Sequence, residues 1–255
     1  MKPAPFAYAA PRTLDEALAL LAEHGDDAKV LAGGQSLVPL LNFRLTRPAM
    51  LVDINRIEGL ARLEAGTIGA LVRTRRVERE ASEPLLRLAA RFVGHTQIRT
   101  RGTVCGSVAH ADPAAELPCA LLALGARARL RSVRGERELG LEELLLGPFT
   151  TALEPDELLV ALAVPEQPSG TRVGFGEHAR VHGDFALAGA AVVARPDALV
   201  VSLFAGAERA VRVDLPANAA EQPREAAALA VRDLQPGHRR ALAETLVRRA
   251  LEEAE

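Results

Sequence analysis

A run of apolar residues at helical spacing predicts the first helix of the chain. The run follows Thr13 and consists of Leu14, Ala17, Leu18 and Leu21. Thr13 and Glu16 have the spacing of a capping box, and Gly25 stands where a helix commonly ends. Apolar runs at 28–32 and 50–54 predict strands. Residues 1 to about 56 are therefore expected to form a small βαβ-like unit.

From residue 57 to about 165 the apolar residues show helical spacing in some segments and the spacing of strands in others. Strands are expected over 67–72 and 158–164, and a hairpin over 126–139 that turns near Gly135. Helices are expected after caps at Thr74 and Ser82, over 115–124 before Gly125, and over 141–145.

A break rich in Pro, Gly and Ser at 165–170 predicts a domain boundary. Beyond it, apolar runs at 185–195 and 198–205 predict two strands joined by the turn pair Pro196-Asp197. The chain is expected to end in a helix over 239–252, whose buried face consists of Leu242, Leu246, Val247 and Ala250.

Composition excludes several classes of function. The 255 residues carry a net charge of only −2, and no long basic run is present, so nucleic acid is not expected as a partner. The arginine-rich stretch 73–79 is interpreted as a solvated helix start. No signal peptide is recognisable, and the longest apolar runs, such as 185–194, are too short to span a bilayer. A soluble, cytoplasmic protein is expected.

Two cysteines, Cys105 and Cys119, are present. They exclude a disulfide framework, and also an all-cysteine iron–sulfur cluster within the chain, because such a cluster needs four thiolates. Both are expected to be small buried apolar residues.

Two glycine-containing segments, 32–37 and 103–113, look like main chain prepared to meet a phosphate. Glycine lets a ligand approach the backbone closely, and consecutive free amides form an anion site. Neither segment is a Walker loop or a dinucleotide fingerprint, and a Gly-Gly pair after a strand is commonly a plain turn. Two such segments in one chain nevertheless suggest a ligand with a diphosphate.

The second segment carries more chemistry. It has hydroxyls at Thr103 and Ser107, unhindered amides at Gly102 and Gly106, and acceptors at Asp112 and Glu116. Asp112 is also expected to cap the next helix, with Pro113 in the first position.

Other polar residues are less specific. His110 could be a base or a metal ligand, but no spacing of metal-ligand type surrounds it, and no metal is expected. A third polar segment, 178–185, precedes an apolar run and could equally be a surface turn. No catalytic acid, base or nucleophile is assigned.

Together these segments resemble the FAD-binding medium subunits of molybdenum hydroxylases, in the carbon monoxide dehydrogenase and xanthine dehydrogenase family. The first signature is Ala-Gly-Gly-Gln-Ser-Leu at 32–37, with Arg44-Leu45-x-Arg47-Pro48 and Leu-Val-Asp-Ile-Asn at 51–55. The second spans 97–118, the third spans 180–186, and 246–251 fits the family's last helix.

The resemblance implies an α+β fold of the vanillyl-alcohol-oxidase (PCMH) type. Two FAD-binding lobes would occupy 1–56 and 57–168, and a small C-terminal domain with a three-stranded sheet and helices would occupy 169–255.

It also implies a set of cofactor-binding residues. Main-chain amides would wrap the FAD diphosphate at Val30, Leu31, Ala32, Gly33, Gly34, Gln35, Ser36 and Leu37. Gly102, Thr103, Gly106 and Ser107 would hold its other side. Asp112 and Glu116 would contact ribityl or ribose hydroxyls, and Leu158 and Leu159 would pack near the adenine or flavin. Asp184 and Phe185 complete the set, with Phe185 beside the isoalloxazine ring.

The implied function is electron transfer, from iron–sulfur clusters in a partner chain through FAD to an external acceptor. Molybdopterin and [2Fe-2S] clusters are expected only in partners, a large molybdopterin subunit and a small iron–sulfur subunit, in a dimer of heterotrimers. Alternatives are a stand-alone FAD-dependent oxidoreductase, or a flavin-free structural or assembly module of the same fold.

The chain departs from the family pattern at several places. Cys105 stands where many members have Gly and would add a side chain beside the diphosphate loop. The segments 60–68, 206–214 and 233–238 look shortened.

Overall fold

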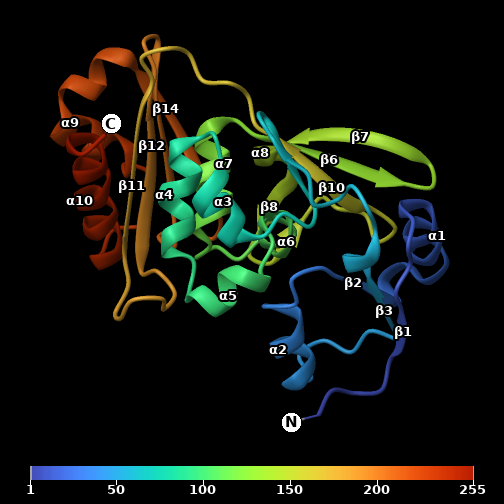
Figure 1. The fold of residues 1–255 in the computed structure, drawn as a ribbon. Coiled ribbons are helices and arrows are strands. Elements are labelled where there is room, and N and C mark those ends of the chain that lie inside the picture. Colours follow the sequence, from blue (N-terminus) through green and yellow to red (C-terminus); the bar gives the residue numbers. More distant parts are fainter. Residues whose placement is uncertain (1, 255) are drawn as a thin grey trace.

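The N-terminal lobe is a small parallel sheet with a helix on it (Figure 1). The computed structural model describes residues 2–254. Strands β1 (Ala7–Ala9), β2 (Ala28–Leu31) and β3 (Met50–Asp53) pair in the order β1-β3-β2. Helix α1 (Leu14–His24) begins at the predicted capping box and buries Ala17, Leu18 and Leu21 of its predicted apolar stripe, whereas Leu14 is half-buried. The βαβ prediction is confirmed, although β1 and the short helix α2 (Leu37–Asn42) were not predicted.

The middle of the chain forms a five-stranded sheet in the order β4-β5-β10-β6-β7. Its strands are β4 (Leu63–Glu64), β5 (Thr67–Gly69), β10 (Leu158–Ala163), β6 (Arg127–Ser132) and β7 (Gly135–Gly140). The predicted hairpin is β6–β7 and turns before Gly135. A second, two-stranded hairpin consists of β8 (Leu145–Gly147) and β9 (Thr150–Thr151).

Six helices among the described residues connect and cover these strands: α3 (Thr74–Glu80), α4 (Pro84–Phe92), α5 (Thr96–Arg101), α6 (Val104–His110), α7 (Glu116–Leu124) and α8 (Leu141–Leu144). Gly125 ends α7 in the left-handed conformation, as predicted. The predicted caps Thr74 and Ser82 are each one residue off, because Arg73 and Glu83 hold the N-cap positions.

Two local predictions around the second glycine segment are wrong. The segment is largely the helix α6, although glycine disfavours a helix interior. Asp112 does not cap the next helix, which starts only at Glu116 after the N-cap Ala115. The Asp112 carboxylate accepts from the Ala114 amide over 2.9 Å, and this local turn delays the helix.

The C-terminal part is an antiparallel sheet between two layers of helices (Figure 1). Strands β11 (Arg172–His178), β12 (Ala188–Ala194), β13 (Ala198–Phe204) and β14 (Val211–Pro216) pair in that order. Helices α9 (Pro223–Ala230) and α10 (His238–Glu252) cover one face, and α4 and α7 cover the other. Strand β12 is buried throughout because both faces are covered, and it begins at Ala188 rather than at the predicted residue 185.

The expected sheet of three strands has four. Strand β14 alternates apolar and charged residues at the sheet edge, and part of the segment that looked shortened, 206–214, forms it. No sheet crosses between the ranges 1–56, 57–168 and 169–255, but one hydrophobic core runs through all three. The division into three domains stays a prediction. No helix among the described residues is long and apolar enough to cross a membrane.

Candidate FAD site

The two glycine segments meet in the folded chain. A Cβ atom added to Gly33 would lie 2.6 Å from the Arg101 carbonyl oxygen and 2.8 Å from Gly102 Cα. Main chain therefore touches main chain at this point, and only glycine at position 33 permits the contact. The two segments that the sequence predicted as separate anion sites therefore lie in direct contact.

The first segment presents free backbone amides. Gly34 has a φ of +74°, which turns the chain from β2 into α2. Its carbonyl accepts from the Val38 amide over 3.0 Å, whereas the amides of Gly34, Gln35 and Ser36 have no acceptor among the described residues. Successive amides of this kind are the groups that hold a phosphate.

The second segment uses its amides differently from the prediction. The Gly102 amide donates to the Ile98 carbonyl over 2.7 Å, and the Gly106 amide donates to Thr103 Oγ1 over 3.1 Å. The expectation that both amides are free is therefore wrong, because Gly102 ends α5 and Thr103 caps α6. The segment offers bare main chain at the start of α6, since neither glycine places a side chain there.

Arg73 and Asn55 fasten the two segments together. Arg73 donates to the Arg101 carbonyl over 2.5 Å and to Asn55 Oδ1 over 2.6 Å. The Asn55 amide donates in turn to the Ala32 carbonyl over 2.8 Å. Arg73 is thus not the solvated residue that the arginine-rich stretch suggested; it links the strand end before Gly33 to the residue before Gly102.

The network continues to the outer strand of the N-terminal lobe. Asp53 accepts from the Asn55 side chain over 2.6 Å and from the Tyr8 hydroxyl over 2.6 Å. Burial opposes ionisation of Asp53, but these hydrogen bonds outweigh it and hold its pKa below the ordinary value. The carboxylate is therefore a stable acceptor that orients Asn55.

A second group of polar residues lies where α7 meets the C-terminal sheet. Burial raises the pKa of Glu116 to about 7, and the negative charge of Asp112 adds to the effect. Burial likewise raises the pKa of Glu177 to about 8, with Glu116 as the charged neighbour. Glu177 Oε2 is buried without a hydrogen-bond partner among the described residues, so the site lacks a donor that a ligand hydroxyl could supply.

The third polar segment joins the same region. Gly183 packs against His95, to whose ring a Cβ at 183 would approach within 2.4 Å, and His95 holds the N-cap position of α5, the helix that leads to Gly102. Phe185 is 70% exposed on this loop, and the Asp184 carboxylate accepts from the Phe185 amide over 2.9 Å. The loop therefore presents an aromatic ring to the surface beside α5.

The remaining predicted site residues lie in different surroundings. Leu158 and Leu159 are buried in the main core, each only 4% exposed. Cys105 is buried too, and its thiol lies 3.5 Å from the Ile68 carbonyl, which it faces as a donor. The Cys105 side chain therefore enters the core and does not crowd the diphosphate loop. The described residues contain no group of three or more potential metal ligands, His110 included.

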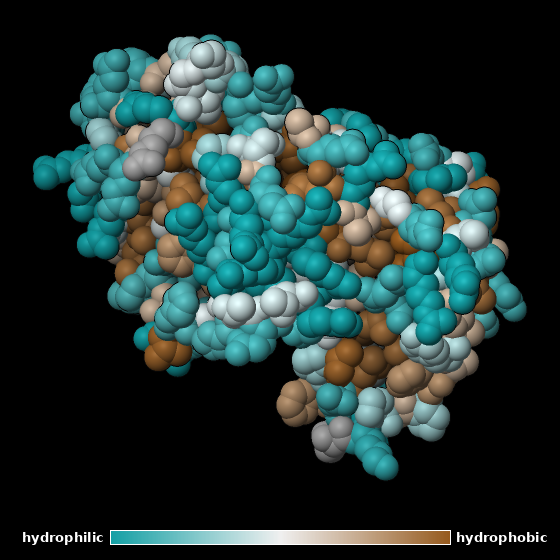
Figure 2. Space-filling model, in the orientation of Figure 1, coloured by the Kyte–Doolittle hydropathy of each residue, from teal (hydrophilic) through white to brown (hydrophobic). Residues whose placement is uncertain are grey.

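An indentation separates the N-terminal lobe from α5 and the rest of the molecule (Figure 2). Hydrophobic surface gathers on the lobe at this side, where α2 lies in Figure 1. Its exposed apolar side chains include Val38, Phe43 and Leu45. Free amides, an acceptor without a donor and apolar surface suit a ligand that combines a diphosphate, hydroxyls and flat rings.

Comparison with known proteins agrees with this geometry. Residues 4–167 match the family described as the FAD-binding domain in molybdopterin dehydrogenase. The chain belongs to this family. Its fold is therefore the PCMH-type FAD-binding fold that the sequence implied, with FAD as the cofactor of the family's domain.

Individual relatives extend the match into the C-terminal part. The carbon monoxide dehydrogenase of Hydrogenophaga pseudoflava that lacks the Mo-pyranopterin moiety superposes with a TM-score of 0.88 at 34% identity, over 99% of this chain and 98% of that one. The 6-hydroxypseudooxynicotine dehydrogenase complex subunit alpha of Paenarthrobacter nicotinovorans is 49% identical, over 77% of this chain and 69% of its own length. The carbon monoxide dehydrogenase medium chain of H. pseudoflava is 37% identical, over 79% and 73%. This FAD-binding protein is thus of the kind that forms a subunit of molybdenum-containing dehydrogenases.

Sequence reasoning missed two residues of the site. Arg73 belongs to an arginine-rich stretch, and no local signal in the sequence distinguishes it from the neighbouring arginines. Glu177 had a signal: with Val173 and Phe175 it forms an alternating row on β11, in which a carboxyl stands at a core-facing position.

Proposed function

We propose that this chain binds FAD between its glycine segments and passes electrons through it, from iron–sulfur clusters in a partner subunit to an external acceptor. The contact of Gly33 with Gly102 carries the proposal, because it brings two distant segments together with bare main chain at their meeting point. The flavin ring supplies the redox chemistry when FAD is bound, and the chain positions it.

The main chain from Val30 to Leu37 holds one side of the diphosphate in this proposal, and the segment from Gly102 to Ser107 holds the other. Asp112, Glu116 and Glu177 accept hydrogen bonds from ribose or ribityl hydroxyls. Because their pKa values are raised, Glu116 and Glu177 can each also hold a proton near neutral pH. Phe185 covers the flavin ring from the exposed loop. Leu158 and Leu159 support the ring from the core.

The partners proposed are a small subunit with [2Fe-2S] clusters and a large molybdopterin subunit, in a dimer of heterotrimers. Two observations support them. The relatives are named as subunits or medium chains of dehydrogenases, and both cysteines of this chain are buried and free. The same assembly would be cytoplasmic in this proposal.

The first experiment measures flavin in the purified chain by visible absorption and by titration with FAD. Gly34→Val is expected to lose at least tenfold in FAD affinity, because it places a β-branched residue at a φ of +74° within 3.2 Å of Leu31 and Val38. Gly170→Val is the matched control, since Gly170 has a φ of +82° with no neighbouring atom within 4 Å. Full FAD affinity in Gly34→Val, with the control also unchanged, would contradict the diphosphate role.

The second experiment tests the assembly. The tagged chain, expressed from its own genome, is expected to co-purify with molybdenum and iron in fixed ratio to flavin. A pure flavoprotein without either metal would instead support the stand-alone oxidoreductase.

A further inference from the structure

A second hollow lies on the N-terminal lobe, outside the proposed FAD site. Its volume is about 650 Å³, and it is lined by the start of α1 and by the segment that follows β3. None of the residues that line it belongs to the glycine segments or to the acidic group around Glu177.

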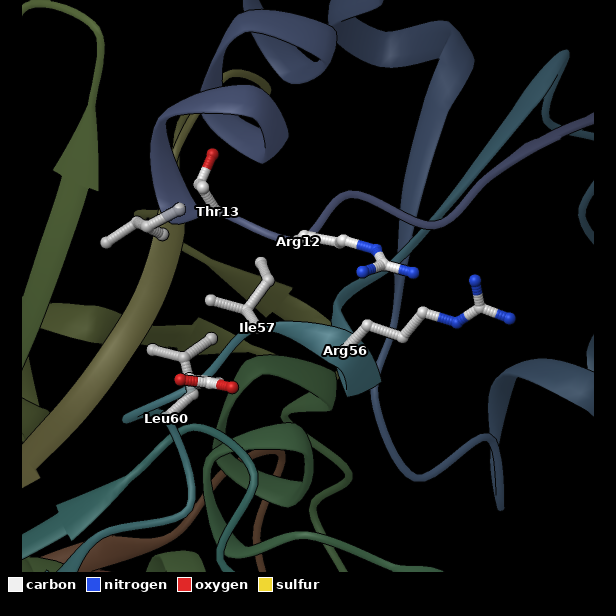
Figure 3. A pocket seen from close by; sticks show the side chains of 7 residues that line it. Arg12, Thr13, Arg56, Ile57 and Leu60 are labelled. Carbon is white, nitrogen blue, oxygen red and sulfur yellow. The ribbon is translucent and has the colours of Figure 1, made fainter.

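Two arginines stand at this hollow (Figure 3). Arg12 follows β1 and Arg56 follows β3, and these strands are parallel neighbours, so both residues lie at the same edge of the sheet. In Figure 3 the two side chains extend in the same direction from the sheet edge. Parallel sheets commonly bind ligands at this edge, beyond the carboxyl ends of their strands.

Neither guanidinium has an ion-pair partner among the described residues. No carboxylate among the described residues forms an ion pair or hydrogen bond with the Arg12 or Arg56 side chain, although the charge of Arg56 helps to lower the pKa of Asp53. Two adjacent positive charges repel each other, and a bound anion removes that repulsion. An anion bound here would therefore be attracted by both side chains.

The floor of the hollow is apolar. Ile57 and Leu60 are 6% and 8% exposed, and Leu14 at the first position of α1 also lines the hollow. Leu14 is only half-buried, so an organic body has apolar surface to cover there that a lone inorganic anion would leave in water. A volume of about 650 Å³ lies within the range of small-molecule sites.

We propose that this hollow binds a nucleoside phosphate, with the phosphate between Arg12 and Arg56 and the nucleoside on Leu14, Ile57 and Leu60. Guanidinium groups bind phosphate oxygens in pairs and also stack on flat rings, so both parts of such a ligand find a partner. The site is separate from the FAD site and goes beyond the proposed electron transfer.

Glu58 places a negative charge at the same hollow. Its carboxylate lines the same hollow and is exposed, so it repels an anion that the arginines attract. Removing this charge is therefore expected to strengthen binding, an effect that general loss of structure could not produce.

The test is calorimetric titration of the FAD-saturated chain with ADP, with adenosine and inorganic phosphate as separate probes. ADP is expected to bind once per chain, more tightly than either probe and more weakly as ionic strength rises. Arg12→Gln and Arg56→Gln are each expected to weaken ADP binding roughly tenfold, since each removes a charge-assisted hydrogen bond. Glu58→Gln is expected to tighten it.

Arg224→Gln, an exposed change on α9, is the control with the same loss of charge and should leave ADP binding unaltered. Flavin absorbance, followed in the same samples, should stay constant. Three results would overturn the proposal: no ADP binding at millimolar concentration, equal ADP affinity in the double arginine variant, or release of flavin by ADP. The last would mean that ADP enters the FAD site, and loss of FAD binding alone would count against the proposed function instead.

Discussion

Arg73 donates a hydrogen bond to Asn55 Oδ1 over 2.6 Å, and this pair connects the two glycine segments of the proposed FAD site. Asn55 holds the carbonyl before Gly33, and Arg73 holds the carbonyl before Gly102. Two residues outside the glycine segments thus set the spacing between them.

Arg73→Ala is therefore expected to weaken FAD binding by roughly tenfold or more and to lower the free energy of unfolding by about 1–3 kcal/mol, because it leaves partly buried acceptors unsatisfied. FAD titration and urea unfolding measure the two effects. Arg79→Ala is the control, an exposed arginine on the same helix. Equal FAD affinity in the two variants would show that Arg73 does not organise the site.

Gly33→Ala tests the contact between the segments. Its Cβ would lie 2.6 Å from the Arg101 carbonyl, so the segments must separate. We expect a loss of FAD affinity of at least tenfold, measured by equilibrium titration. Gly147→Ala should have no effect, since no atom lies within 4 Å of its added Cβ. A Gly33→Ala chain that binds FAD as tightly as the Gly147→Ala chain would show that the close contact is not needed.

Glu177 predicts a particular dependence of stability on pH. Its pKa is raised by burial from 4.5 to about 8, so the folded chain binds this proton more tightly than the unfolded chain does. Its contribution is therefore fully present below about pH 4.5 and is lost as pH rises toward 8.

Glu177→Gln should remove part of this loss and raise the free energy of unfolding at pH 8 by on the order of 1 kcal/mol, with little change at pH 4.5. Urea unfolding of the flavin-free chain at both pH values measures it. Glu208→Gln, at an exposed position, provides the reference. A uniform shift at both pH values would argue against an ionisation at Glu177.

Phe185→Ala should change the absorption and fluorescence of bound flavin without changing the stability of the fold. The side chain is 70% exposed, so its loss removes little core packing. We expect an altered visible spectrum and brighter fluorescence of bound FAD, because a nearby aromatic ring quenches flavin emission, with thermal unfolding within about 0.5 kcal/mol of the parent. Val181→Ala, 65% exposed on the same loop, is the comparison. Identical flavin spectra in both variants would show that Phe185 does not lie beside the flavin ring.

Local pattern predicted much of the fold because its signals act over a few residues. The capping box at Thr13 and the glycine that ends α7 are set by hydrogen bonds to near neighbours. The same reasoning failed for α6, where helix propensity disfavours Gly106 but Thr103 caps the helix and the core holds it. It also failed for Asp112, which has the residue type of a cap but forms a tighter local turn.

The sequence by itself determined the family, the two glycine segments, the apolar runs and the absence of enough thiolates for a cluster, because residue types and short spacings carry these properties. Only the tertiary structure decided that Gly33 touches Gly102, that Arg73 reaches Asn55 and that Glu177 lies beside Glu116. Gly33 and Gly102 are 69 positions apart in the sequence, Asn55 and Arg73 are 18 apart, and Glu116 and Glu177 are 61 apart. No local preference encodes such distances; they follow from how the sheets and helices pack around a shared core.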